Sequence, residues 1–258
     1  MCVDIVDEKA TSLECGKATE RQISSITGVV FSKHEWSCKP SVDRNLDPHF
    51  IQEFQNICDT WGKRNESDRR QYIDCVMRHA VIAAGLKGKV RIYTEVKMNQ
   101  LSSKRDSLGK NFDLNGKADY TVTHDTEDVT DDEKILAQMH LVGGEAKADW
   151  PDKALTQLSA YAGIIHRKRK AAAKTNLKVW GFLSNGQLWK FLRVTADGNL
   201  EVSELFDIGD LRIVKLEKLR VVMGIMVHVL IAAYNSSPTG TPVESLENLA
   251  ISSQSNSP

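Results

Sequence analysis

The stretch LVGGEAKADW, from Leu141 to Trp150, decides the fold expected for this chain. Its apolar start and paired glycines predict a short buried strand. Glu145 and Lys147 then project from one face, because residues i and i+2 of a strand face the same way. Charges are costly to bury without partners or a metal, so a Glu-x-Lys pair in an apolar strand needs an explanation. Two explanations are considered, a metal-dependent phosphodiesterase site and a simple cross-face ion pair on a half-exposed strand. On these two residues alone, the ion pair is favoured.

Two more strands are predicted upstream of this stretch. Residues 89–97 alternate between apolar and polar side chains, and residues 117–123 do the same after a polar, glycine-containing loop. An acidic surface insertion over 124–139 then leads to the third strand, 141–148. Each of the three strands carries one acid on its pleat, namely Glu95, Asp119 and Glu145.

Helices are predicted on both sides of these strands. Asp47-Pro48 is typical of a helix start, and a helix to about Trp61 is followed by a second over 68–84 that stops at Gly85. Pro151 starts a third helix, which ends in basic residues. Strands over 177–183, 187–194 and 200–206 are separated by the turn signals Asn-Gly and Asp-Gly, and an apolar helix covers 216–234.

This order of elements predicts an α/β chain of the α+β kind, a mixed sheet with helices packed on its faces. We assign the domain to residues 47–235. Residues 1–46 show no sustained period except a strand over 26–31, so we expect a loosely ordered arm. Residues 236–258 are rich in Ser, Pro, Asn and Thr and have nothing to bury, which predicts a disordered tail.

The amino-acid composition restricts the kinds of partner and cellular compartment that we expect for the protein. The 34 basic and 34 acidic residues cancel, so any site for a polyanion must come from local clustering. Five cysteines without C-x-x-C spacing argue against a zinc site and for reduced thiols inside a cell. The acidic N-terminus is unlike a secretory signal. The apolar helix is shorter than the roughly 20 residues that cross a bilayer, so it either lies under other elements or forms a homodimer contact through 216–234.

Three carboxylates on adjacent strands suggest a cation. Neighbouring strands lie about 4.8 Å apart, so Glu95, Asp119 and Glu145 could surround one Mg²⁺ or Mn²⁺ if their positions are in register. Magnesium prefers hard oxygen ligands and keeps several waters, which a few acids can satisfy. Such an ion polarises a phosphoryl oxygen and lowers the pKa of water. Lys147 would lie beside the attacking water or the scissile phosphate.

The segments GKADY (116–120), GEAK (144–147) and Gln157 in the next helix resemble the PD-(D/E)XK nuclease superfamily over about residues 66–194. The block VWGFLSNG (179–186), with Trp189 and Phe191, is similar to the variety in Crinkler-type effectors and related fungal and protist accessory nucleases. The resemblance implies a restriction-endonuclease-like core of helix, three strands, helix and strand. It also implies metal binding by Asp119, Glu145 and the Ala146 carbonyl, with Lys147 as the catalytic lysine and Gln157 assisting.

The chain departs from that pattern at several points. Ala118 stands where the superfamily name has proline, a common variation. Many relatives carry a further Glu in the first helix, where Glu66 and Asp74 are both imperfect candidates, and Glu95 could take that role. Residues 1–46 contain nothing like the Crinkler translocation header.

These observations predict a Mg²⁺- or Mn²⁺-dependent endonuclease that acts on DNA. The alternative is a catalytically silent nuclease-like domain that binds nucleic acid or a protein partner. The basic run at the end of the third helix could contact phosphates, act as a nuclear-import patch, or simply suit a helix C-terminus. Its cationic members are Arg167, Lys168, Arg169 and Lys170.

Overall fold

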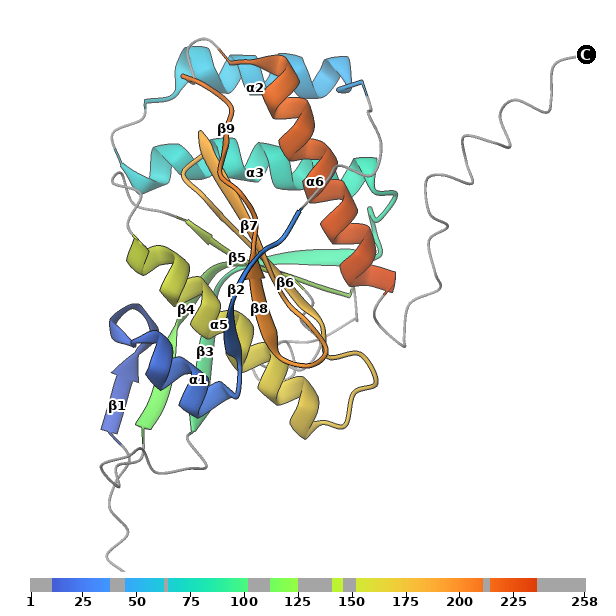
Figure 1. Ribbon diagram of the computed structural model, residues 1–258. Helices are drawn as coiled ribbons and strands as arrows, with labels where there is room; N and C mark the ends of the chain where they lie inside the picture. The colour runs from blue at the N-terminus through green and yellow to red at the C-terminus, as the bar shows by residue number, and fades with distance from the viewer. Residues whose placement is uncertain are drawn as a thin grey trace, which may run out of the picture.

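A mixed sheet with helices on both faces organises the molecule in the computed structural model (Figure 1). The structure describes residues 11–37, 45–62, 65–101, 112–124, 141–145, 152–210 and 214–235. Within these ranges nine strands join one sheet, most of them in the order β1-β4-β5-β6-β7-β8-β2, while β3 pairs with β4 and β9 with β7. The mixed α+β architecture expected from the sequence is confirmed.

The three predicted central strands form an antiparallel meander. They are β3 (Val90–Leu101), β4 (Phe112–His124) and β5 (Leu141–Glu145). The helix α5 (Asp152–Ala171) then crosses to β6 (Val179–Ser184), which runs parallel to β5. Among the described residues, the order from α3 to β6 is therefore helix, strand, strand, strand, helix, strand. The sheet continues through β7 (Leu188–Val194), β8 (Asn199–Val202) and β9 (Phe206–Asp207).

One face of the sheet is covered by α3 (Glu66–Ala83) and α6 (Leu216–Asn235), and α2 (Pro48–Thr60) packs on α3 (Figure 1). The α2 start is as expected, with Pro48 in the first turn and the Asp47 side chain accepting from the His49 amide at 2.7 Å. Gly85 follows α3 with a φ of 67°, a left-handed conformation that suits glycine. The core on this face includes Tyr72, Phe182 and Trp189.

The apolar helix α6 lies under other elements of the same chain. It packs against α3, and ten of its side chains are buried. This burial accounts for its apolar character without a second copy of the chain. No helix in the described ranges combines the length and apolarity that a membrane crossing needs.

The opposite face is covered by α5 and by a helix from the N-terminal segment. This segment contains β1 (Thr11–Glu14), the 3-10 turn η1 (Cys15–Lys17), α1 (Glu20–Thr27) and β2 (Val30–Glu35). β1 pairs in parallel with β4, and β2 pairs in parallel with β8. A capping box between Thr19 and Gln22 starts α1.

The expectation of a loosely ordered arm is therefore wrong for residues 11–37. The predicted strand over 26–31 is also misplaced, since α1 runs to Thr27 and β2 starts at Val30. Four- and six-residue strands are too short to show a clear period, and the strands that stabilise them come about a hundred residues or more later. The expected tail over 236–258 lies outside the described residues.

Candidate functional site

The candidate site lies where the β3–β4 ladder is interrupted. Thr94 pairs with Tyr120 and Val96 with Ala118, so the register is the same on both sides, but the ladder skips Glu95 and Asp119. Glu95 has a φ of 55°, and a positive φ is uncommon for any residue other than glycine and marks local strain or a functional constraint. Tyr120 contributes to the core beneath α3 and α6, whereas Ala118 contributes to the core beneath α5. Ala118 and Tyr120 thus face opposite sides of the sheet, although residues i and i+2 of a regular strand face the same side, and the change occurs at Glu95 and Asp119.

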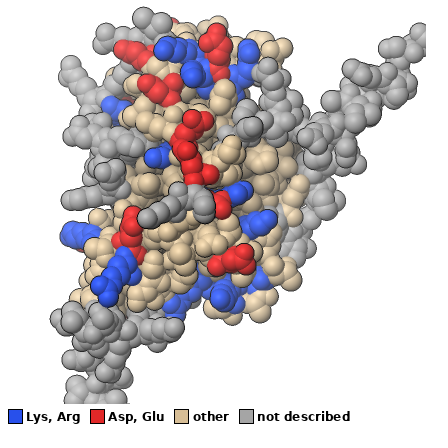
Figure 2. Space-filling model, in the orientation of Figure 1, with Lys and Arg blue, Asp and Glu red and all other residues tan. Residues whose placement is uncertain are grey.

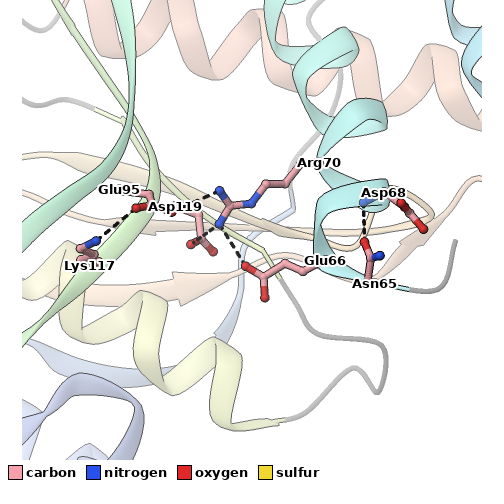
Figure 3. Close-up of polar contacts among 7 residues, drawn as sticks. All are labelled: Asn65, Glu66, Asp68, Arg70, Glu95, Lys117 and Asp119. Atoms are coloured by element: carbon pink, nitrogen blue, oxygen red, sulfur yellow. Dashed lines mark hydrogen bonds and ion pairs between the residues drawn. The ribbon is translucent and has the colours of Figure 1, made fainter. Parts of the chain in front are cut away.

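Three carboxylates from three elements converge on one guanidinium at this place (Figure 3). Arg70 of α3 donates through Nη2 to Asp119 Oδ1 on β4 at 3.2 Å and to Glu66 Oε1 at 3.0 Å. Its Nη1 lies 3.6 Å from Glu95 Oε1 on β3. The side chains of Arg70 and Asp119 are 24% and 26% exposed, so the cluster is open to solvent but partly sheltered.

A second cation approaches the cluster from the side of β4. Lys117 Nζ donates to Glu95 Oε2 at 3.1 Å. Lys117, and to a smaller degree Arg70, lower the pKa of Glu95, so this carboxylate is ionised at neutral pH. Among the residues that the structure describes, three carboxylates therefore face the two cations Arg70 and Lys117.

The structure brings β5 to the same level of the sheet. Val122 pairs with Leu141 and Tyr120 with Gly143, so β5 approaches the level of Asp119 as it runs toward its last residue. The backbone of Glu145 is in register with Ser184 of β6. Ala146 and Lys147 lie outside the described residues. The structure thus describes the backbone of the Glu-x-Lys stretch only as far as Glu145.

Gln157 of α5 is linked to β4 by its hydrogen bond to Tyr161, which packs on that strand. Its Nε2 donates to the Tyr161 hydroxyl at 2.6 Å. Tyr161 packs so closely on β4 that a Cβ at Gly116 would come within 2.7 Å of its hydroxyl. Burial raises the pKa of Tyr161 to about 12, so the phenol stays protonated. The recorded hydrogen bond of Gln157 is with a tyrosine and not with the carboxylates.

The basic run on α5 does not form one exposed patch. Arg169 is 1% exposed and donates to the carbonyl of Asn176, so its predicted role in phosphate contact is wrong. Arg167 donates to the carbonyl of Ile26 on α1, and Lys168 to Asn99 Oδ1 at 3.2 Å. Lys170 is exposed. The run therefore mainly holds the end of α5 and does not support a nuclear-import patch.

The aromatic block that shares the resemblance belongs to the core. Trp180, Trp189 and Phe191 are 5%, 0% and 0% exposed, so none of them offers a free face for stacking on a base.

Arg70 is a residue of the candidate site that the sequence patterns did not identify. Its spacing of four from Glu66 was the available signal, because i and i+4 side chains meet on a helix.

A fit to Mg²⁺ can be judged from the donor set. Glu66, Glu95 and Asp119 offer the hard oxygen ligands that this ion prefers. Within the described ranges, however, only Glu53, Cys75 and His79 bring three ligand atoms within 4.8 Å of one another. The acidic cluster therefore has the right chemistry for Mg²⁺, but its carboxylates surround Arg70 and do not meet that distance.

No protein-family model matches the chain, and no curated protein matches it either. The likeness to PD-(D/E)XK nucleases accordingly rests on the motifs quoted above.

Proposed function

We propose that the chain is a Mg²⁺- or Mn²⁺-dependent nuclease that hydrolyses phosphodiester bonds of DNA on a restriction-endonuclease-like core. The observation that carries this proposal is the meeting of acids from α3, β3 and β4 beside the C-terminal end of β5. The helix-strand-strand-strand-helix-strand order agrees with the core that the motifs imply.

Each residue then has a defined task. A bound divalent ion would supply Lewis-acid polarisation of the phosphate and a lowered pKa for the attacking water. Asp119 and Glu145 are the proposed ligands, with the Ala146 carbonyl and with Glu66 or Glu95 in support. Lys147 orients the attacking water or stabilises charge that develops on the phosphate.

Arg70 has to change partners in this scheme. In the structure it satisfies the carboxylates with its own charge, and a divalent ion competes with it for Asp119. Once released, its guanidinium would lie beside the site and could donate two parallel hydrogen bonds to two oxygens of a phosphate. Acidic and basic side chains alternate on the face in Figure 2, so such local contacts, not an overall positive field, would hold the DNA.

Cleavage assays on plasmid and oligonucleotide DNA with Mg²⁺ or Mn²⁺ test the proposal. Asp119→Asn, Glu145→Gln and Lys147→Ala are each expected to lower kcat by roughly 100-fold or more, as loss of one transition-state contact does. Matched controls are Asp197→Asn, Glu204→Gln and Lys87→Ala, all at exposed positions outside the cluster. Cleavage that survives in all three site variants would sink the mechanism.

A catalytically silent nuclease-like module is the second candidate, and one observation favours it. Arg70 already neutralises Asp119 and Glu66, as a residue that replaces a metal would. In that case the wild-type protein would bind DNA or a protein partner without any divalent ion and would cut nothing under Mg²⁺ or Mn²⁺.

A further inference from the structure

A mixed group of three possible metal ligands lies between α2 and α3, away from the acidic cluster. Glu53 comes from α2, and Cys75 and His79 come from α3. One ligand atom from each side chain lies within 4.8 Å of the other two. His79 Nε2 is 2.7 Å from Glu53 Oε2.

Helix geometry explains why these side chains meet. Residues i and i+4 of a helix lie on one face, so Cys75 and His79 are stacked one turn apart on α3. α2 packs along α3, and in Figure 1 it lies on the side of α3 away from the sheet. Glu53 of α2 thereby supplies the third possible ligand from the neighbouring helix.

The surroundings hold the group in place and leave it accessible. Arg78 donates to Glu53 Oε1, so the other carboxylate oxygen is the one turned to His79. The Phe50 ring lies 5.0 Å from the His79 ring and restricts its rotation. Cys75 is fully buried, whereas the side chains of His79 and Glu53 are 15% and 35% exposed, which gives an ion a path from solvent.

We propose that Glu53, Cys75 and His79 bind one Zn²⁺ ion, with water as the fourth ligand, and that this ion ties α2 to α3. One sulfur, one imidazole nitrogen and one carboxylate oxygen are all accepted zinc donors, at about 2.3, 2.0 and 2.0 Å. A thiolate with an imidazole selects Zn²⁺ over Mg²⁺, which prefers an all-oxygen set. The site is independent of the proposed nuclease activity.

A reactive cysteine is a poorer explanation of the same group. A nucleophilic or redox-sensing cysteine needs exposure to solvent, and Cys75 is fully buried. The absence of C-x-x-C spacing argues against sites built from several cysteines, whereas the proposed site has a single cysteine and takes its other ligands from two helices.

Metal titration of the full chain tests this site, with Co²⁺ as a coloured substitute for Zn²⁺. One equivalent of Co²⁺ should give a thiolate-to-metal charge-transfer band, and Zn²⁺ should remove the band by displacement. Cys75→Ser should abolish the band. His79→Ala and Glu53→Gln should each weaken Zn²⁺ affinity by more than the roughly 10- to 100-fold that loss of an outer-shell partner costs.

Cys15→Ser is the matched control, because Cys15 is a buried cysteine of the other core cluster, and this variant should bind as the wild type does. Thermal unfolding of every variant in chelator shows whether it is folded, and His79→Ala and Glu53→Gln keep the proposal testable if Cys75→Ser does not fold. A plain ion pair between the helices predicts no charge-transfer band in the wild type. That result, or a band that persists in Cys75→Ser, overturns the proposal.

Discussion

Arg70 is the residue on which the state of the acidic cluster depends. Its guanidinium is shared by Glu66 and Asp119 through one nitrogen and approaches Glu95 through the other. Carboxylates from three elements would repel one another without a cation between them. Either Arg70 or a divalent ion can therefore neutralise these carboxylates, and the two compete for Asp119.

Removal of Arg70 tests whether a divalent ion can take its place among the carboxylates. Arg70→Ala is expected to lower stability in chelator by about 1 kcal/mol, since partly exposed ion pairs contribute modestly. Mg²⁺ should then raise the melting temperature of the variant more than that of the wild type, because binding to the folded state alone stabilises it. Thermal scans with and without Mg²⁺ measure both effects.

Arg193→Ala is the matched control for this comparison. Arg193 of β7 also loses a carboxylate partner, Glu201, but it is outside both the acidic cluster and the Glu53–Cys75–His79 group. Its response to Mg²⁺ should equal that of the wild type. An equal Mg²⁺ response in Arg70→Ala would show that the arginine does not stand in for a cation.

At the scale of elements, the contact between α1 and α5 shows how the N-terminal segment joins the fold. Gly163 of α5 faces Thr27 of α1, and a Cβ at this glycine would lie 2.8 Å from Thr27 Oγ1 and 3.0 Å from its Cβ and Cγ2. Thr27 is buried, and its hydroxyl donates to the Ile23 carbonyl at 2.7 Å. The glycine thus lets the two helices approach closely.

Gly163→Ala should destabilise the protein, although the same change usually stabilises an exposed helix by about 1 kcal/mol. Overpacking costs typically about 1–3 kcal/mol, and here it opposes that gain. Urea unfolding measures the net change. Thr27→Ala in the same chain should recover part of the loss, because the two positions are in contact. A Gly163→Ala protein more stable than the wild type would show that α1 does not pack here.

At the scale of the whole molecule, the sequence predicts long periodic elements well and local irregularities poorly. The helices and the longer strands from α2 to α6 follow the predicted order, because they are long enough to show their period, whereas the strand predicted over 200–206 is divided into the short β8 and β9. The β1 and β2 strands were missed, since only distant partners define them. The positive φ of Glu95 has no sequence signature, and it helps to set which face Asp119 presents. Side-chain types thus identified the candidate acids, while their meeting point on Arg70 required the tertiary structure.

Three histidines give the whole fold a pH dependence. His124 and His166 are buried and His228 is half-buried, and burial lowers the pKa of each below its ordinary value of 6.5. The unfolded chain therefore binds more protons than the folded one just below pH 6.5. Their stabilising effect is present above that pH and is lost as the pH falls toward the folded-state pKa values.

The free energy of unfolding should consequently decrease below about pH 6.5, with a slope of up to about 1.4 kcal/mol per pH unit for each histidine. The lowered pKa values of Glu53 and Glu95 add a further loss only below their ordinary value of 4.5, so the two ranges can be separated. Urea unfolding between pH 8 and pH 5 measures the slope. His166→Gln should reduce it, since a glutamine cannot take up the proton, while the exposed His49→Gln serves as the control. A slope unchanged in His166→Gln would mean that this imidazole is protonated alike in the folded and unfolded chain.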